Sequence, residues 1–183
     1  MNPVFPSFSR FISISLLSVF SAQAGESYPV ATTMHTLFAV PYRLYARPAD
    51  TEQQLALNCF TAVLYALRRE FPGCSILDIR QAQAYWWPRS RPLRLGESRI
   101  GPRGALLLSR AHFLLLEADS NGNGVIDGGD PVIHAYFRPL EINSIDDWLA
   151  ESGRPPVRYL PLDENFPCPT VEERRSLEGI RRK

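Results

Sequence analysis

Cysteine is scarce in this chain of 183 residues, which contains only Cys59, Cys74 and Cys168. Three cysteines are too few for a disulfide-built scaffold, so a hydrophobic core has to stabilise the fold. An excess of charge is also absent, because 20 Lys and Arg stand against 19 Asp and Glu. Without a basic excess there is no long-range attraction for nucleic acid or anionic membranes, and we expect neither as a partner.

The first 24 residues have the three parts of a secretory signal. Arg10 gives the positive charge, residues 11–20 are apolar, and Ala22-Gln23-Ala24 is an A-x-A cleavage site. We expect residues 25–183 to form one domain that is periplasmic or secreted. The alternatives are an uncleaved anchor and a buried N-terminal helix. Beyond residue 24 no apolar run approaches the roughly 18 residues of a membrane span, so none is expected.

Apolar spacing predicts an α+β fold, with one main helix early in the chain and then an antiparallel sheet. The expected helices are 51–70, 145–151 and 170–181; the expected strands or extended segments are 36–46, 74–80, 104–109, 112–118, 132–137 and 158–162; and 85–103 is expected to be an irregular surface loop. Two alternatives stay open. Asn58 is a good helix cap and would start a separate helix at Cys59, and residues 104–118 would also fit a single helix.

Residues 119–130 match the twelve positions of an EF-hand-type calcium loop. Oxygen donors fall at positions 1, 3, 5, 7, 9 and 12, and Gly124 stands at position 6, where the chain must turn sharply. The expected ligands are Asp119, Asn121, Asn123, the Val125 carbonyl, Asp127 and Asp130. Calcium takes six to eight oxygens, so the spacing predicts this metal. The other interpretation is a plain solvated turn, which Asn-Gly and Asp-Gly also favour.

The flanks of this loop differ from those of an ordinary EF-hand. Pro131 and a β-branched, aromatic segment follow the loop, which favours a strand over an exit helix. We therefore expect the loop to lie at the tip of a β-hairpin. Position 12 holds Asp130, where Glu is usual, and this predicts a Kd on the order of 10⁻⁵ to 10⁻³ M.

Cys59 directly follows the expected helix cap Asn58, and an amphipathic helix follows. The partial positive charge and free N–H groups of a helix N-terminus favour a thiolate, which is how proteins prepare a nucleophilic cysteine. Of the chain's three histidines, His112 and His134 flank the calcium loop. Cys59, His112 and His134 are the candidate catalytic residues.

In this respect the chain resembles the NlpC-type family of papain-like cysteine peptidases, which cleave cell-wall peptides. The family's cysteine helix motif, its Gly-Asp-Leu-type strand, its catalytic histidine strand and its Ile-His-Ala strand are similar, in order, to residues 58–61, 104–107, 112–116 and 133–135. The chain departs from the family pattern at Asn58 and Ala105, where the family has Asp. An inactive member that acts as an inhibitor or immunity-type binder is therefore a further interpretation.

The resemblance implies a papain-like fold in which the Cys59 helix packs on the sheet. It also implies roles: Cys59 attacks an amide carbonyl, His112 transfers the proton and His134 orients His112. The two histidines share a face of the hairpin only in an even register, which calcium at the tip would help to set. The implied substrate is a peptide, and the resemblance suggests cell-wall peptide as its class; the sequence does not indicate the oligomeric state.

Export would place the three thiols in an oxidising compartment, where they tend to pair and one is left over. A Cys74–Cys168 bridge leaves Cys59 free, whereas a Cys59–Cys74 bridge removes the nucleophile. The sequence leaves both open.

Tyr85-Trp86-Trp87, followed by arginines, suggests either stacking on a sugar or an acidic partner, or aromatics that pack on the core. The leading hypothesis is an exported, calcium-binding thiol hydrolase that cleaves an amide bond. The alternative is a non-catalytic calcium-binding module that binds a protein or glycan, with Trp86 and Trp87 as candidate contacts.

Overall fold

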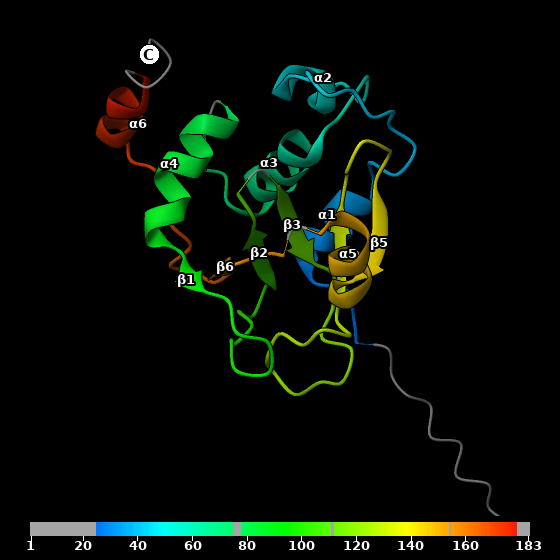
Figure 1. The fold of residues 1–183 in the computed structure, drawn as a ribbon. Coiled ribbons are helices and arrows are strands. Elements are labelled where there is room, and N and C mark those ends of the chain that lie inside the picture. Colours follow the sequence, from blue (N-terminus) through cyan, green and yellow to red (C-terminus); the bar gives the residue numbers. More distant parts are fainter. Residues whose placement is uncertain (1–24, 75–77, 111, 154, 179–183) are drawn as a thin grey trace, which may run out of the picture.

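The computed structural model describes residues 25–74, 78–110, 112–153 and 155–178, which form an α+β fold (Figure 1). Within these residues the helices are α1 (Pro29–His35), α2 (Pro48–Glu52), α3 (Cys59–Glu70), α4 (Ile79–Arg89), α5 (Ile145–Ser152) and α6 (Val171–Glu178). The strands are β1 (Arg91–Pro92), β2 (Ala105–Leu108), β3 (Phe113–Leu116), β4 (Pro131–His134), β5 (Glu141–Ser144) and β6 (Arg158–Pro161). The expected signal segment 1–24 lies outside the described residues.

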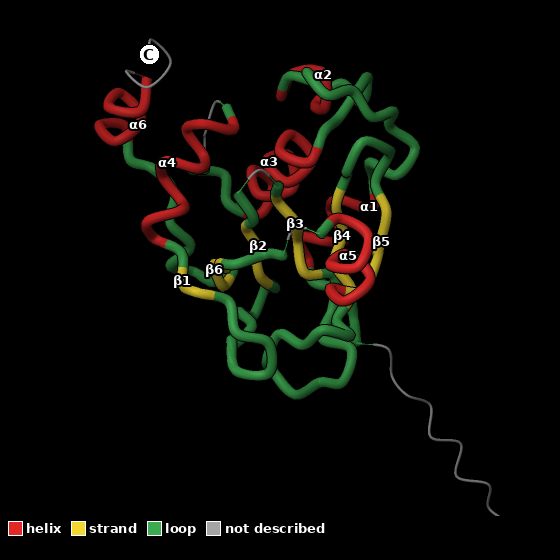
Figure 2. Tube along the Cα trace, viewed as in Figure 1, coloured by secondary structure: helices red, strands yellow, loops and turns green. Residues whose placement is uncertain are grey.

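The strands form one antiparallel sheet in the order β1-β6-β2-β3-β4-β5. Because successive side chains on a strand point to opposite faces, each face has its own core. Phe113 and Leu115 belong to the larger core, to which α1, α3 and α4 contribute, whereas Leu114 and Leu116 belong to a smaller core with α5. Figure 2 shows α5 lying over β4 and β5, and the shared core residues place it on that face.

The expected helix 51–70 is wrong as a continuous element. The structure has two helices, α2 and α3, joined by turns, which is the alternative that Asn58 suggested. The Asn58 side chain accepts hydrogen bonds from the N–H groups of Phe60 (3.1 Å) and Thr61 (2.9 Å), so it caps a new helix. Eight consecutive residues of α3, from Phe60 to Leu67, are buried, so α3 is the central helix of the larger core.

The expected strands 104–109, 112–118 and 158–162 are confirmed with shorter bounds as β2, β3 and β6, and the helix 145–151 is confirmed as α5. The expected strand 132–137 is confirmed only as far as His134. The chain then turns, and Phe137 has φ +57°, a left-handed conformation that a strand does not accommodate. The last helix, expected to reach 181, is described to Glu178; residues 179–183 lie outside the described part.

The extended segment expected at 36–46 is wrong. The chain forms α1 and then turns, and Tyr42 makes only an isolated bridge with Leu57. Val30, Ala31 and Met34 are buried at helical spacing behind Pro29, which begins the helix. Proline at the first helical position is a signal that predicts this start.

The strand expected at 74–80 is also wrong where it can be compared. The irregular loop expected at 85–103 is wrong for its first part, which belongs to α4 and β1, and is confirmed for residues 93–103. Residues 75–77 lie outside the described part, and α4 begins at Ile79 after the side chain of Asp78 accepts a hydrogen bond from Gln81 N–H (2.9 Å). Pro88 in the last turn does not end α4 earlier, because the buried Tyr85 and Trp86 anchor it to the core.

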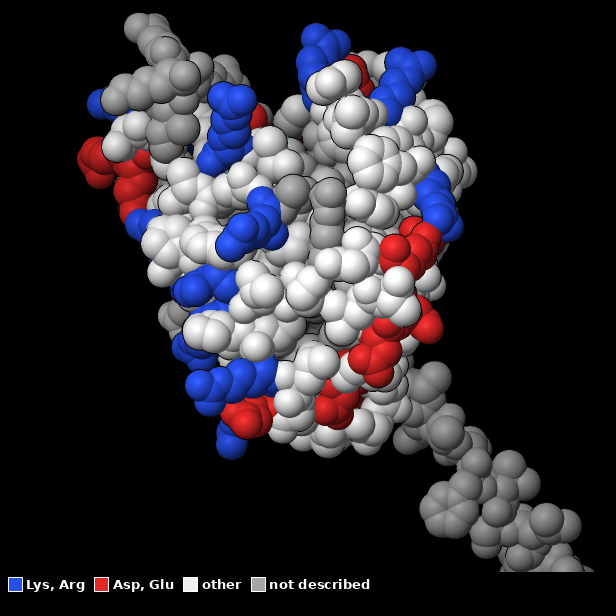
Figure 3. Space-filling model, viewed as in Figure 1, with Lys and Arg blue, Asp and Glu red and all other residues white. Residues whose placement is uncertain are grey.

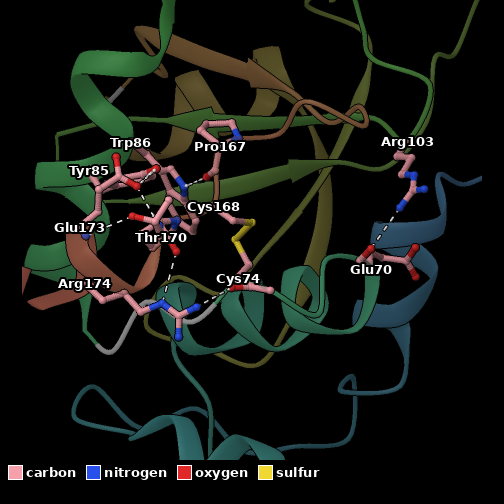
Figure 4. The surroundings of a disulfide bond; sticks show 12 residues. Glu70, Cys74, Tyr85, Trp86, Arg103, Pro167, Cys168, Thr170, Glu173 and Arg174 are labelled. Atoms are coloured by element: carbon pink, nitrogen blue, oxygen red, sulfur yellow. Dashed lines mark hydrogen bonds between the residues drawn. A yellow bond between two sulfur atoms is a disulfide. The ribbon is translucent and has the colours of Figure 1, made fainter.

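A disulfide joins Cys74, after α3, to Cys168, before α6 (Figure 4). Beside it the Trp86 indole N–H donates to the Pro167 carbonyl (3.0 Å), and Arg174 donates to the Gly73 carbonyl (3.2 Å). The C-terminal segment is thereby fixed against α3 and α4. In the described part of the chain every helix is too short or too polar to cross a lipid bilayer.

Candidate functional site

Cys59 is the first residue of α3 and the free cysteine of the chain, since the other two are bridged. Its side chain is partly exposed. The cap leaves the first N–H groups of the helix pointing toward the same end, where Cys59 lies. An unbridged thiol at a helix start is thus present where the sequence placed it.

Three backbone N–H groups face the Cys59 sulfur, those of Cys59, Phe60 and Phe113, and each lowers its pKa. β3 pairs with β4 at Leu115 and Leu116, and the N–H of Phe113 at the start of β3 faces the sulfur instead. Burial has the larger effect and raises the pKa of the Cys59 thiol to about 11. The resting thiol is therefore protonated near neutral pH, in a site with donors that would stabilise a negative charge.

Cys59 and His112 line the same cavity, which has a volume of about 660 Å³. Residues of α2 and of the start of α4 also line it, and in Figure 3 the molecule is hollowed between these two regions. Tyr45 and Phe137 at its mouth are 89% and 65% exposed, whereas His112 is buried. The cavity is thus an aromatic-rimmed opening that leads to a thiol and an imidazole.

His112 and His134 lie on one face of the sheet. The register that pairs Leu115 with Ile133 places His112 and His134 at an even offset, and their ring centroids are 5.5 Å apart at 79°. Both rings contact Trp148 of α5: His112 stacks on it at 4.7 Å and 16°, and His134 meets its edge at 4.4 Å.

The face that carries these imidazoles is not the face on which α3 packs. Cys59 packs against the larger core, and the rings of His112 and Tyr136 lie with Trp148 on the α5 side. The cavity at the start of β3 is where the thiol and His112 come together. Cys59 therefore shares this cavity with His112, whereas His134 is not among the residues that line it.

His134 is fully buried, and burial lowers the pKa of its imidazole to about 4. The nearby Asn143 side chain opposes this shift, and Arg138 adds to it. The Glu141 carboxylate lies 3.9 Å from Nδ1 of His134. His134 is neutral near pH 7, and among the described residues neither of its ring nitrogens has a hydrogen-bond partner, so it meets the His112 ring by edge-to-face packing.

Loop 119–130 connects β3 to β4, so strands flank it on both sides. The Asp119 carboxylate accepts from the N–H groups of Gly122 (2.8 Å) and Gly124 (2.7 Å), and Gly124 has φ +78°. This is the sharp turn that position 6 requires, in a conformation that favours glycine. Ile126 at position 8 is fully buried and anchors the loop in the smaller core.

The remaining polar side chains of the loop converge on two carboxylates. The amide groups of Asn121 and Asn123 donate to the same oxygen of Asp127 (2.8 and 2.6 Å), and these bonds lower its pKa. The Asp130 carboxylate is buried and accepts from Ser120 N–H (2.9 Å) and Asp127 N–H (2.8 Å), which closes the loop.

The donor set fits calcium chemically, since it consists of carboxylates, amide oxygens and a carbonyl, all hard oxygen ligands. Burial raises the pKa of Tyr28, and the negative charges of Asp119 and Asp130 raise it further, so both carboxylates lie close to the same tyrosine. Across residues 25–178 as described, no group of three or more His, Cys, Asp or Glu side chains is arranged to hold a metal ion.

The proposed ligand contact through Trp86 is wrong, because Trp86 is fully buried and bonded to the Pro167 carbonyl. Trp87 is half-buried, and the guanidinium of Arg158 lies 5.6 Å from its ring. Sequence reasoning missed Tyr136 and Trp148, which pack against the histidines. No local signal distinguishes them from ordinary core aromatics.

No protein-family model matches the chain, and no curated protein matches it. The case for a function therefore depends on the geometry of the site and on the likeness of its motifs.

Proposed function

We propose that this protein is an exported thiol hydrolase that cleaves an amide bond in a peptide, with a papain-like arrangement of its site. The observation that carries this proposal is the free Cys59 at the capped start of α3, in one cavity with His112 and faced by three backbone N–H groups. The resemblance to NlpC-type peptidases makes cell-wall peptide the substrate class to test first. The disulfide supports export, because such bridges persist in oxidising compartments.

In the proposed reaction the Cys59 sulfur attacks the amide carbonyl carbon while His112 accepts the thiol proton. A carbon–sulfur bond forms, and the carbonyl π electrons move to oxygen. Of the N–H groups that face the sulfur, that of Phe60 also donates to the Asn58 cap, and those of Cys59 and Phe113 would donate to this oxygen. When the carbon–nitrogen bond breaks, His112 returns the proton to the leaving amine, and water then hydrolyses the thioester. His134, neutral and buried, orients His112 by edge-to-face packing of the two rings.

We also propose that loop 119–130 binds calcium through Asp119, Asn121, Asn123, the Val125 carbonyl, Asp127 and Asp130. Calcium there would supply fixed positive charge at the hairpin tip and so order the loop. The proposal rests on the oxygen donor set and on the folded turn at Gly124.

The direct test is release of new amino groups from purified cell-wall peptides by the mature protein. We expect release by the unaltered chain, loss with Cys59→Ala and a strong reduction with His112→Ala. His35→Gln is the matched histidine control, since His35 is not among the residues that line the cavity, and it should retain activity. Full activity of Cys59→Ala would contradict the proposal.

Two observations favour a second candidate, a non-catalytic calcium-binding module whose cavity holds a peptide. The thiol is protonated at rest, and the histidine rings pack on the α5 side. Peptide binding that is measurable by calorimetry, with no amine released and with equal affinity in Cys59→Ala, would favour this candidate.

A further inference from the structure

We propose that Trp148 is a positioning residue that holds the His112 imidazole and transmits to it the geometry of loop 119–130. This inference rests on the proposed function for its catalytic meaning, whereas the physical coupling can be tested without any substrate. The proposed coupling between the loop and His112 is separate from the β3–β4 register, because it runs through α5.

The loop and the start of α5 are joined by backbone hydrogen bonds. Ile145 N–H donates to the Asp130 carbonyl (3.0 Å), and Asp146 N–H donates to the Gly128 carbonyl (2.9 Å). These are the first N–H groups of the helix, which have no partner within it. The last positions of the loop therefore serve as the capping surface of α5.

Side chains also meet at this junction. A Cβ atom at Gly128 would lie 2.4–2.6 Å from the exposed carboxylate of Asp146, so a larger residue there would turn that side chain on the first turn of α5. The Asp130 side chain, buried at the same place, closes the loop onto Ser120 and Asp127. A change at the C-terminal end of the loop is thus passed to the first turn of α5 through the two backbone hydrogen bonds.

The inner side of α5 carries this geometry to the histidines. Ile145 and Trp148 are each 1% exposed and share the smaller core with Ile126 of the loop. One turn into the helix, the Trp148 indole lies flat against the His112 ring at 4.7 Å.

Trp148 is the common neighbour of every ring in this group. It contacts Tyr136 at 5.0 Å and His134 at 4.4 Å, and each of these also contacts His112. The His112 ring therefore lies against three aromatic groups, of which only Trp148 belongs to the helix that caps onto the loop. Displacement of α5 has to displace or rotate the imidazole.

The test is a calcium titration of ¹⁵N-labelled mature protein, observed through its few imidazole resonances. Assignment by His112→Gln and His134→Gln variants identifies the signals. We expect the His112 signals to shift in step with calcium binding measured by calorimetry. In Trp148→Leu calcium should still bind, and the His112 response should be lost.

Two further variants make the result specific. Trp148→Phe keeps an aromatic plane against His112 and should restore the response of the His112 signals. This variant also provides a comparison if Trp148→Leu does not fold. Trp87→Leu, a half-buried tryptophan on α4, should respond like the unaltered protein. Three results would each overturn the inference: His112 signals that stay unchanged while calcium binds, no calcium binding at all, or an undiminished response in Trp148→Leu.

The kinetic readout separates this inference from the proposed function. If the protein hydrolyses peptide, Trp148→Leu should lower kcat by about 10- to 100-fold with little change in KM, as expected when a catalytic group is misplaced. If no hydrolysis is found but the His112 signals follow calcium, the coupling stands and the hydrolase proposal fails.

Discussion

At the scale of the residue, two opposing effects act on Cys59. Its position at a helix start favours the thiolate, whereas burial at the back of a cavity favours the neutral thiol. Burial is the larger effect, so the site does not keep a preformed thiolate in its resting state. This is consistent with a nucleophile that loses its proton to His112 only as it attacks.

The first prediction concerns the pH dependence of Cys59 labelling. With a thiol pKa of about 11, the rate of reaction with iodoacetamide should rise about tenfold per pH unit from pH 7 to beyond pH 9. An ordinary thiol would level off near its usual pKa of 9.0. Mass spectrometry of the labelled, unreduced protein measures the rate, with Cys59→Ala as the blank. A rate that is already at its plateau at pH 7 would contradict the assignment.

The second prediction concerns His134, whose pKa is lowered from 6.5 to about 4. As the pH falls through 6.5 the unfolded chain binds a proton there and the folded chain does not, so the folded state loses up to about 3 kcal/mol between pH 6.5 and 4. In His134→Leu, urea unfolding should show a flatter dependence on pH in this window.

Val132→Ala is the matched control for this experiment, because Val132 is buried on the same strand and face as His134. It should lower stability by an amount that does not depend on pH. If His134→Leu retains the full acid-dependent loss, another group causes it.

At the scale of the element, loop 119–130 has its turn and its internal hydrogen bonds formed by its own side chains. Asp119 and Gly124 make the turn, and Asp130 closes the loop. The same residues were singled out by sequence spacing alone, because calcium ligation needs oxygens at these positions and Asn, Asp and Gly also favour turns.

The third prediction is that Asp127→Asn weakens calcium binding at least about tenfold, because it removes one of three carboxylates from the loop. Isothermal calorimetry on metal-free protein measures this. Asp147→Asn changes a carboxylate in the first turn of α5, outside the loop, and should leave the affinity unchanged. Equal affinities in the two variants would show that loop 119–130 is not the binding site.

At the scale of the whole molecule, one disulfide and two cores hold the fold together. The sheet separates the α3 side from the α5 side, and the cavity at the start of β3 connects them. Figure 3 shows acidic side chains gathered over α5 and arginines over the α4 side, although the chain as a whole is nearly neutral. The Cys74–Cys168 bridge joins the segment after α3 to the segment before α6, and the two cysteines are 94 residues apart in the sequence.

The fourth prediction is that reduction lowers the free energy of unfolding by up to about 4–5 kcal/mol, since a bridge over so long a loop restricts the unfolded chain. Urea unfolding with and without dithiothreitol measures the loss. Cys59→Ser should show the same loss, because Cys59 is not bridged. Disappearance of the reductant effect in Cys59→Ser would indicate a different pairing.

The sequence by itself determined the elements whose signals are local. The Asn58 cap, the apolar runs of β2 and β3, and the donor spacing of loop 119–130 depend on residues a few positions apart. Helix α1 and helix α4 were missed because Pro29 and Pro88 were not taken as helical and because burial of Trp86 depends on distant partners.

Only the tertiary structure decided which two cysteines pair, since several pairings satisfy the same sequence. It also decided that Trp148 lies against His112 and that the histidine rings face α5 while Cys59 lies on α3. These outcomes depend on which face of the sheet each element covers. Sheet faces are set by packing between segments far apart in the chain, and local spacing carries no information about that packing.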